Sequence, residues 1–129
     1  IYGNLTRINL RNAHLPNADL ATSSLRGADL PGAFLADADL KDASLDNATL
    51  TNAEFSGATL THAFLIGANL RNAHLDDDTL TTARTINAIL ANASLADADL
   101  TDSYLRNNDL SKANLYDANL SDAYLIRII

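Results

Sequence analysis

The sequence predicts an all-β solenoid, a fold in which short extended segments and turns wind into stacked coils. Three regularities predict it. Of the 25 positions divisible by five between Leu5 and Leu125, 23 are leucine, and the exceptions are Phe55 and Thr85. Two residues before each of these lies a second regular position, and 19 of those 25 residues are alanine. The second residue after each leucine position is Gly, Asn or Asp in 19 of 26 cases.

A period of five residues matches neither an α-helix, which repeats near 3.6 residues, nor a strand, which repeats at 2. The alanine and the leucine are two residues apart, so both lie on one side of an extended segment. The next two residues break this alternation. Gly, Asn and Asp tolerate the positive φ of a turn, and Pro16-Asn17 and Pro31-Gly32 fit a type II turn. Each pentad is therefore a short extended segment followed by a corner.

The pattern Ala-Asp/Asn-Leu-x-x recurs along the whole chain, as in Ala18-Asp19-Leu20, Ala28-Asp29-Leu30, Ala98-Asp99-Leu100 and Ala118-Asn119-Leu120. It resembles the repeat of the pentapeptide repeat family. The resemblance implies a right-handed parallel β-helix with a quadrilateral cross-section and four pentads per coil. A single domain over residues 1–129 would then have about six to seven coils. The outward residue of each pentad also changes character with a period of ten, which favours an even number of sides.

Composition and motifs argue against several classes of function. The chain has no Cys, and its net charge of −7 argues against direct binding to nucleic acid. We find no phosphate-binding glycine loop or nucleophile elbow, and His14, His62 and His74 are too dispersed to share a metal. We therefore expect no enzyme activity, cofactor or metal.

No apolar run approaches the roughly 18 residues of a membrane span, and the N-terminus does not resemble a signal peptide. We expect a soluble protein without membrane contact, and the compartment stays open. Because the chain begins at Ile1 and contains no Met, we also expect that flanking sequence is missing.

The repeat is irregular over residues 76–89. Asp78 occupies an inward alanine position and Thr85 an inward leucine position. A buried carboxylate must be paired, protonated or hydrated. A local bulge that turns outward, a kink or notch for a partner, and a metal site are the three interpretations. Ser23, Ser103 and Asn108 also replace inward alanines, and we expect them to bond to neighbouring backbone.

The two ends carry isoleucines that the repeat does not require. Open solenoid ends expose unpaired edges and need caps. We therefore expect apolar caps at residues 1–8 and 126–129, with end-to-end homodimerisation as the alternative.

Under a period of twenty, the charges segregate around the coil. One half carries eight of the nine basic residues and three acids, a net charge of +5, and the other half carries thirteen acids and Lys41, a net charge of −12. Asp is also a favoured turn residue, so solvated surface acid is the simpler interpretation. The candidate acidic face for a partner consists of Asp37, Asp39, Asp42, Asp77, Asp97, Asp99, Asp102, Asp117 and Asp122.

A second candidate face is the column Phe64, Arg84, Tyr104 and Tyr124, whose members are twenty residues apart. Aromatic and Arg side chains are common anchors at interfaces. Ordinary stacking between coils would also explain the column. Both interpretations stay open at this point.

The leading hypothesis is a non-enzymatic structural or protein-interaction module with an unknown protein partner. The alternative follows from the resemblance, since some family members mimic duplex DNA and occupy the DNA site of type II topoisomerases. Thirteen acids along a rod of roughly 30 Å give about one charge per 2.3 Å, against ~1.7 Å in duplex DNA. The centre of the repeat here is leucine, whereas the topoisomerase-binding members often have phenylalanine there.

Overall fold

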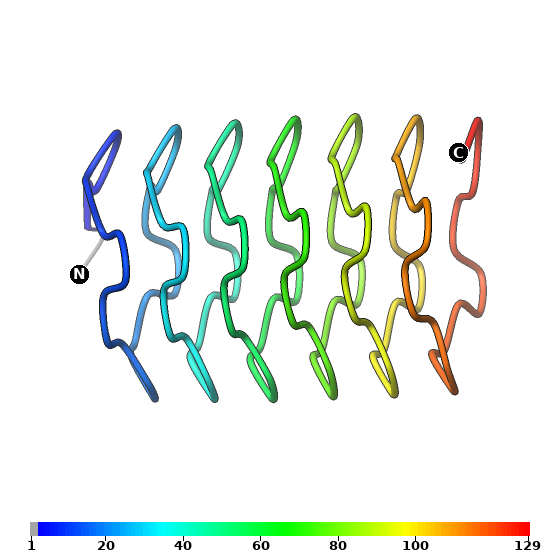
Figure 1. Ribbon diagram of the computed structural model, residues 1–129, viewed down its shortest axis with the longest axis horizontal. Helices are drawn as coiled ribbons and strands as arrows, with labels where there is room; N and C mark the ends of the chain where they lie inside the picture. The colour runs from blue at the N-terminus through cyan, green and yellow to red at the C-terminus, as the bar shows by residue number, and fades with distance from the viewer. Residues whose placement is uncertain (1–2) are drawn as a thin grey trace.

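The computed structural model describes residues 3–129. These residues contain no helix, and so none that could cross a membrane. Their regular structure is a series of isolated parallel β-bridges, each joining a residue to the one twenty positions further on, from Asn4–Ser24 to Tyr104–Tyr124. Twenty residues therefore form one coil. Figure 1 shows the coils stacked in a row, with the two termini at opposite ends.

The extended segments are shorter than conventional strands. Each pentad gives two residues to a turn, so only the outward residue between the alanine and the leucine forms a bridge with both neighbouring coils. The predicted β-structure is thus present as one-residue bridges, and residues 3–129 contain no longer strand.

Each corner is a type II turn. φ is positive at every fifth residue from Arg7 to Arg127. From Ile8 to Ser103, and again at Ala113, Ala118 and Ala123, the N–H of the following inward residue donates to the carbonyl three positions earlier, as from Ala33 N to Leu30 O at 3.1 Å. A positive φ confined to the third residue of such a turn defines type II. The turn predicted at Pro31-Gly32 is confirmed.

The leucine and alanine side chains fill the inside of the coils. Those in the middle of the rod, from Leu25 to Leu105, are buried, and Phe55 fits into a leucine position with no exposed surface. Each buried leucine stabilises the fold by about 1.5–3 kcal/mol relative to exposure. Because each coil contacts only its neighbours, stability is close to a sum over adjacent coils.

The N–H of the residue after each leucine position has no backbone partner, and over residues 24–105 it is the one such donor in each pentad. An outward Asn or Asp two positions earlier often accepts from it, as Asn9 Oδ1 does from Arg11 N at 3.1 Å. The same bond is made by Asn4, Asp19, Asp39, Asn69, Asp99, Asp109, Asn114 and Asn119. Proline, which lacks this N–H, holds the position at Pro16 and Pro31. Small polar outward residues therefore complete the turns.

The C-terminal residues continue the coil instead of covering its end. Asn107 N donates to Ile126 O at 2.8 Å, and Leu110 N donates to Ile129 O at 2.9 Å. Ile128 packs against the core, but Ile126 is 51% exposed and Ile129 is 79% exposed. The cap expected at 126–129 is thus an extension of the stack, because its backbone groups pair with the preceding coil.

The N-terminal cap expected at residues 1–8 falls partly outside the described residues, which begin at Gly3. Ile8 takes an inward position and is half-buried against the leucine core. It therefore belongs to the first coil and forms no separate plug.

Candidate interaction surfaces

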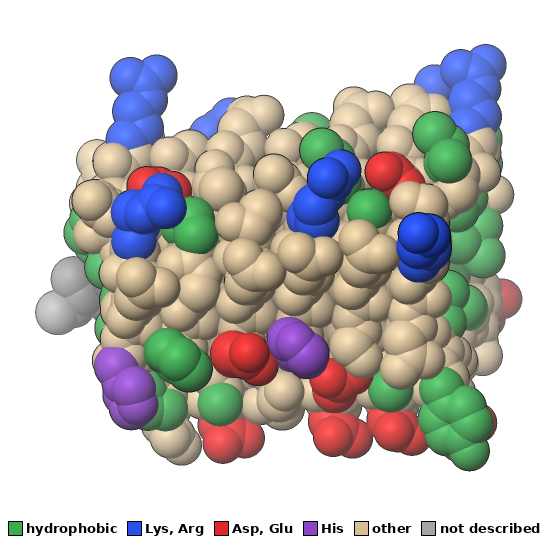
Figure 2. All heavy atoms as spheres, viewed as in Figure 1, with side chains coloured by type: hydrophobic (Ala, Val, Ile, Leu, Met, Phe, Trp, Pro, Cys, Tyr) green, Lys and Arg blue, Asp and Glu red, His purple; other side chains and the backbone are tan. Residues whose placement is uncertain are grey.

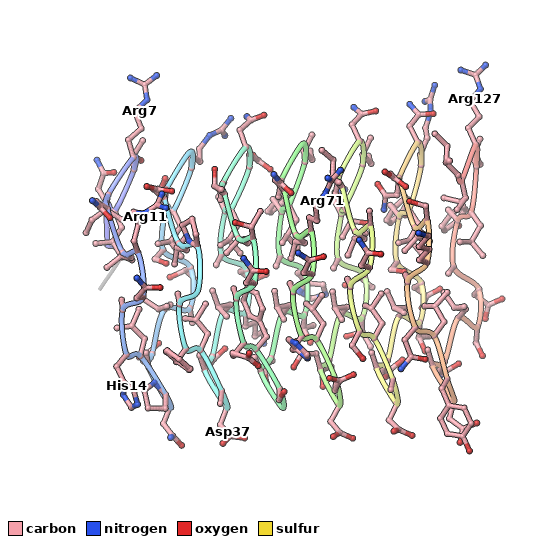
Figure 3. The ribbon with its side chains drawn as sticks, viewed as in Figure 1. Arg7, Arg11, His14, Asp37, Arg71 and Arg127 are labelled. Carbon is pink, nitrogen blue, oxygen red and sulfur yellow. The ribbon has the colours of Figure 1, made fainter. Side chains whose placement is uncertain are left out.

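The nine acidic candidates lie in three adjacent columns along the rod. Two columns are corners with positive φ, and the column between them is an outward, bridged one. Figure 3 places Asp37 on one edge of the rod and Arg7 and Arg127 on the opposite edge. In Figure 2, acidic side chains gather along the first edge and basic ones toward the second. The three columns are Asp37, Asp77, Asp97 and Asp117; Asp39 and Asp99; and Asp42, Asp102 and Asp122.

The corner geometry does not explain why these residues are acidic. φ is positive at all described corners, so Gly, Asn and Asp suit every one of them. Acids nevertheless occupy only two of the four corner columns. The other two consist of Arg7, Gly27, Asn47, Gly67, Asn87, Asn107 and Arg127, and of Asn12, Gly32, Asn52, Asn72, Asn92 and Lys112.

Asparagine corners also bond to one another between coils. Asn72 Nδ2 donates to Asn52 Oδ1 at 3.1 Å, and Asn107 Nδ2 donates to Asn87 Oδ1 at 3.0 Å. An ionised Asp has no proton to donate, and like charges on neighbouring coils, about 4.8 Å apart, repel. The acidic columns are therefore less stable than asparagine columns would be.

Two of the three acids on the basic side of the rod form ion pairs with arginine, and the third, Asp109, accepts from Ser111 N. Arg11 binds Asp29 at 3.0 Å, and Arg26 binds Asp46 at 3.3 Å. The hydroxyl and the N–H of Ser111, and more weakly Arg71, lower the pKa of Asp109. By contrast, within residues 3–129 the nine candidates make one contact with a basic side chain, between Asp42 Oδ1 and His62 Nδ1, at 3.2 Å.

Two of the nine carboxylates complete turns. Asp39 Oδ1 accepts from Lys41 N at 2.9 Å, and Asp99 Oδ1 accepts from Thr101 N at 3.0 Å. An Asn at either position could accept the same bond, as Asn69 does. The turn thus explains the oxygen acceptor but leaves the charge unexplained.

The second candidate column is a continuous stack. The Arg84 guanidinium carbon lies 5.5 Å from the ring centre of Phe64 and 5.6 Å from that of Tyr104. The rings of Tyr104 and Tyr124 are 4.7 Å apart and within 5° of parallel. The ring faces are thus turned toward their neighbours along the rod, which is the stacking arrangement, and the ring edges face outward.

A surface groove joins the two candidate faces. Its walls are the aromatic column on one side and a corner column on the other. The sequence analysis predicted the two faces separately. Their adjacency is nevertheless visible in the sequence, because positions 62 and 64 flank a single buried alanine. The groove is lined by His62, Phe64, Thr82, Arg84, Asp102, Tyr104 and Tyr124.

At the irregular repeat, the backbone continues without a bulge. Asp78 is 1% exposed, so it has not turned outward, and the bridge from Thr79 to Asp99 is kept. Asp78 Oδ1 accepts from Ala58 N at 2.8 Å, while Oδ2 is buried and has no partner within residues 3–129. Burial raises the pKa of Asp78 from 3.8 to about 8, and the bond from Ala58 opposes that rise. A buried carboxyl group must be paired, protonated or hydrated, and these observations favour protonation for Asp78.

Thr85, the second inward substitution, has a hydrogen-bond partner on the next coil. Asn108 Nδ2 donates to Thr85 Oγ1 at 2.6 Å, and Asn108 Oδ1 accepts from Ala88 N at 3.0 Å. Ser23 Oγ donates to Leu20 O, as expected. The expectation is wrong for Ser103, whose buried hydroxyl has no partner in the described part of the chain.

The metal interpretation of the irregular repeat gains no support. Asp76 is engaged elsewhere, accepting from the Ser94 hydroxyl and from Ala96 N. Across residues 3–129, no group of three His, Cys, Asp or Glu side chains is placed to hold a metal ion.

The family model for pentapeptide repeats matches residues 4–42, 38–77 and 88–125, with eight copies. This chain belongs to the pentapeptide repeat family. The unmatched stretch, residues 78–87, contains both Asp78 and Thr85.

Solved structures of pentapeptide repeat proteins resemble the chain. Rfr23 from the cyanobacterium Cyanothece 51142 is 26% identical with a TM-score of 0.68, over 94% of this chain and 86% of that one. A protein from the Arabidopsis thaliana thylakoid lumen is 33% identical with a TM-score of 0.45, over 78% and 70%. HetL from Nostoc sp. strain PCC 7120, a protein involved in heterocyst differentiation regulation, is 20% identical with a TM-score of 0.44, over 96% and 90%. A search of curated proteins found no match.

Proposed function

We propose that this chain is a non-enzymatic interaction module that presents its acidic face to a basic surface of a protein partner. The scaffold would be a right-handed, four-sided β-helix of about six to seven coils. Bridges twenty residues apart and a type II turn at every fifth residue support that geometry.

The observation that carries the proposal is the confinement of carboxylates to two of four equivalent corner columns. Asparagine would suit the same φ and would bond between coils, as Asn52 and Asn72 do. The charge is therefore retained at a cost in stability. A partner rich in Lys and Arg would neutralise that repulsion on binding and would be steered to the face by its charge.

The groove beside the acidic corner gives the same partner an adjoining contact. Asp102 lines one wall, and the edges of Tyr104 and Tyr124 line the other. Arg84 is held between two rings, so little side-chain freedom is lost when it forms a hydrogen bond. We propose this column as the secondary contact of the interface.

The test is affinity capture with a variant that removes charge and keeps the turns. Changing Asp37, Asp77, Asp97 and Asp117 to Asn leaves residues that tolerate positive φ. The matched control changes Asp29 and Asp109, two acids on the basic half, to Asn. The proposal predicts a partner that the parent and the control retain and the four-site variant loses. Equal retention by all three proteins would contradict it.

A specific alternative is that the acidic face imitates duplex DNA for a type II topoisomerase. The acidic columns run parallel to the rod axis, and the charge spacing of about 2.3 Å is comparable with that of DNA. DNA gyrase supercoiling with the parent and the four-site variant tests this. Inhibition by the parent that the variant loses would establish mimicry, and no inhibition at tens of micromolar would reject it.

End-to-end self-association stays a separate prediction. Leu125, Ile126 and Ile129 are exposed on the last coil of this chain. Sedimentation over a range of concentrations tests it, since a rod of doubled length would appear as concentration rises.

A further inference from the structure

Asp78 is the one buried inward side chain in residues 3–129 that carries a carboxyl group. The inward residues that occupy the same position in the coils directly before and after it, Ala58 and Ala98, are apolar. One of its carboxyl oxygens accepts from Ala58 N, and the other has no partner within residues 3–129. A carboxylate in such a place is strongly disfavoured, whereas the neutral acid is tolerated.

The groups around Asp78 reinforce the neutral form. On its own coil, Asp76 and Asp77 are negative, and both raise its pKa. The preceding coil presents no ionisable side chain over residues 55–60, and the following coil presents two more acids, Asp97 and Asp99. The nearby basic side chain is His74, whose Nδ1 lies 3.6 Å from Asp76 Oδ2 and therefore contacts that carboxylate and not Asp78.

The coil is also loosely closed at this point. The turn bond from Asp78 N to Leu75 O measures 3.4 Å, the longest of the turn bonds in residues 3–129. Ala58 N does not depend on Asp78, because it also donates to Phe55 O at 3.0 Å. The coil can thus release Asp78 without leaving that donor unpaired.

We propose that Asp78 is a pH-sensitive catch in the middle of the rod. With Asp78 protonated, the coil around it stays closed. As pH rises, the ionised form is stabilised only where the carboxylate reaches water, so the coil opens locally. Opening would break the bonds that hold the segment to the next coil, including those from Asp77 N to Ala96 O and from Asp99 N to Asp78 O. These bonds lie beside the acidic corner, so opening would disturb the spacing of Asp77 and Asp97 there.

Hydrogen exchange measured by segment tests the catch. Between pH 5 and 7, protection of the amides of Asp77 and Asp99, corrected for the intrinsic exchange rate, should fall about tenfold per pH unit in the parent. Asp78→Asn should abolish this slope, and Asp78→Ala provides a second variant with the residue found in the neighbouring coils. Asp77→Asn, which removes an adjacent outward charge, should keep it.

Two results would overturn the proposal. One is a parent whose protection at Asp77 and Asp99 does not vary with pH, or varies equally in Asp78→Asn. The other is an equal slope in residues 24–50, since this would mean that the whole rod opens together and not at the catch.

Discussion

The pair formed by Thr85 and Asn108 gives a sharp test of the interior. Both replace the apolar residues of the repeat, and Asn108 Nδ2 donates to Thr85 Oγ1 at 2.6 Å. Thr85→Leu alone adds two buried carbons, a gain of about 0.8 kcal/mol each. It also leaves the Asn108 amide unpaired, at a cost of about 1–3 kcal/mol. The single variant should therefore be no more stable than the parent.

Asn108→Ala together with Thr85→Leu restores the repeat. Ala88 N keeps its bond to Thr85 O at 2.9 Å, so no donor is orphaned. Leu65 and Leu105 fill the equivalent positions in the adjoining coils, so the site accepts a leucine. The double variant should exceed the parent by about 1.5 kcal/mol.

The assay is a double-mutant cycle by urea unfolding, followed by circular dichroism. The cycle should give a coupling energy of about 1–3 kcal/mol between positions 85 and 108. Additive effects, with a coupling below about 0.5 kcal/mol, would refute the compensation.

Three further outcomes are expected. Leu50→Asp places a charge in the leucine core and should unfold the neighbouring coils, which a loss of circular dichroism signal would show and an unchanged melting temperature would contradict. Asp78 is protonated more readily in the folded state than in the unfolded state, so its contribution to stability falls as pH rises from about 4 to about 8 and is constant above that. Asp78→Ala should therefore be more stable than the parent at pH 7 by about 3 kcal/mol, which is about 4 kcal/mol from the pKa difference less about 1 kcal/mol for the lost hydrogen bond. A large loss of stability by calorimetry would instead mean that Asp78 has specific partners. Asp97→Asn should raise the melting temperature by a few degrees at low salt by relieving repulsion from Asp77 and Asp117, and a rise that persists unchanged at 1 M salt would exclude that electrostatic cause.

The sequence was sufficient for the core and the corners because each residue type there has one structural task. Leucine every five residues predicts the interior, and Asn17 or Gly32 after proline predicts a turn. The twenty-residue coil came from the resemblance, since a five-residue spacing does not say how many corners close a coil. Within the structure, this period is seen directly in bridges such as Asn4–Ser24.

Other features could not be predicted because they depend on which backbone groups remain unpaired. The acceptor role of Asn9 becomes visible only once the N–H of Arg11 is known to lack a backbone partner. The bond between Asn108 and Thr85 joins residues on successive coils, on either side of one corner column, and no periodic pattern marks it. Outward relaxation of Asp78 was a reasonable expectation for a carboxylate, but the bridges on both sides hold its segment in place.

The same bridges limit how the chain can change in length. Removing five residues preserves every leucine and alanine position, so the interior is unaffected. It also rotates all later residues by one corner, and a deletion before Asp97 would move that carboxylate into the column of Asn12 and Asn52. Removing twenty residues keeps each column aligned and only shortens the rod. A surface built from columns can therefore gain or lose whole coils, whereas a change of a single pentad divides it between two edges.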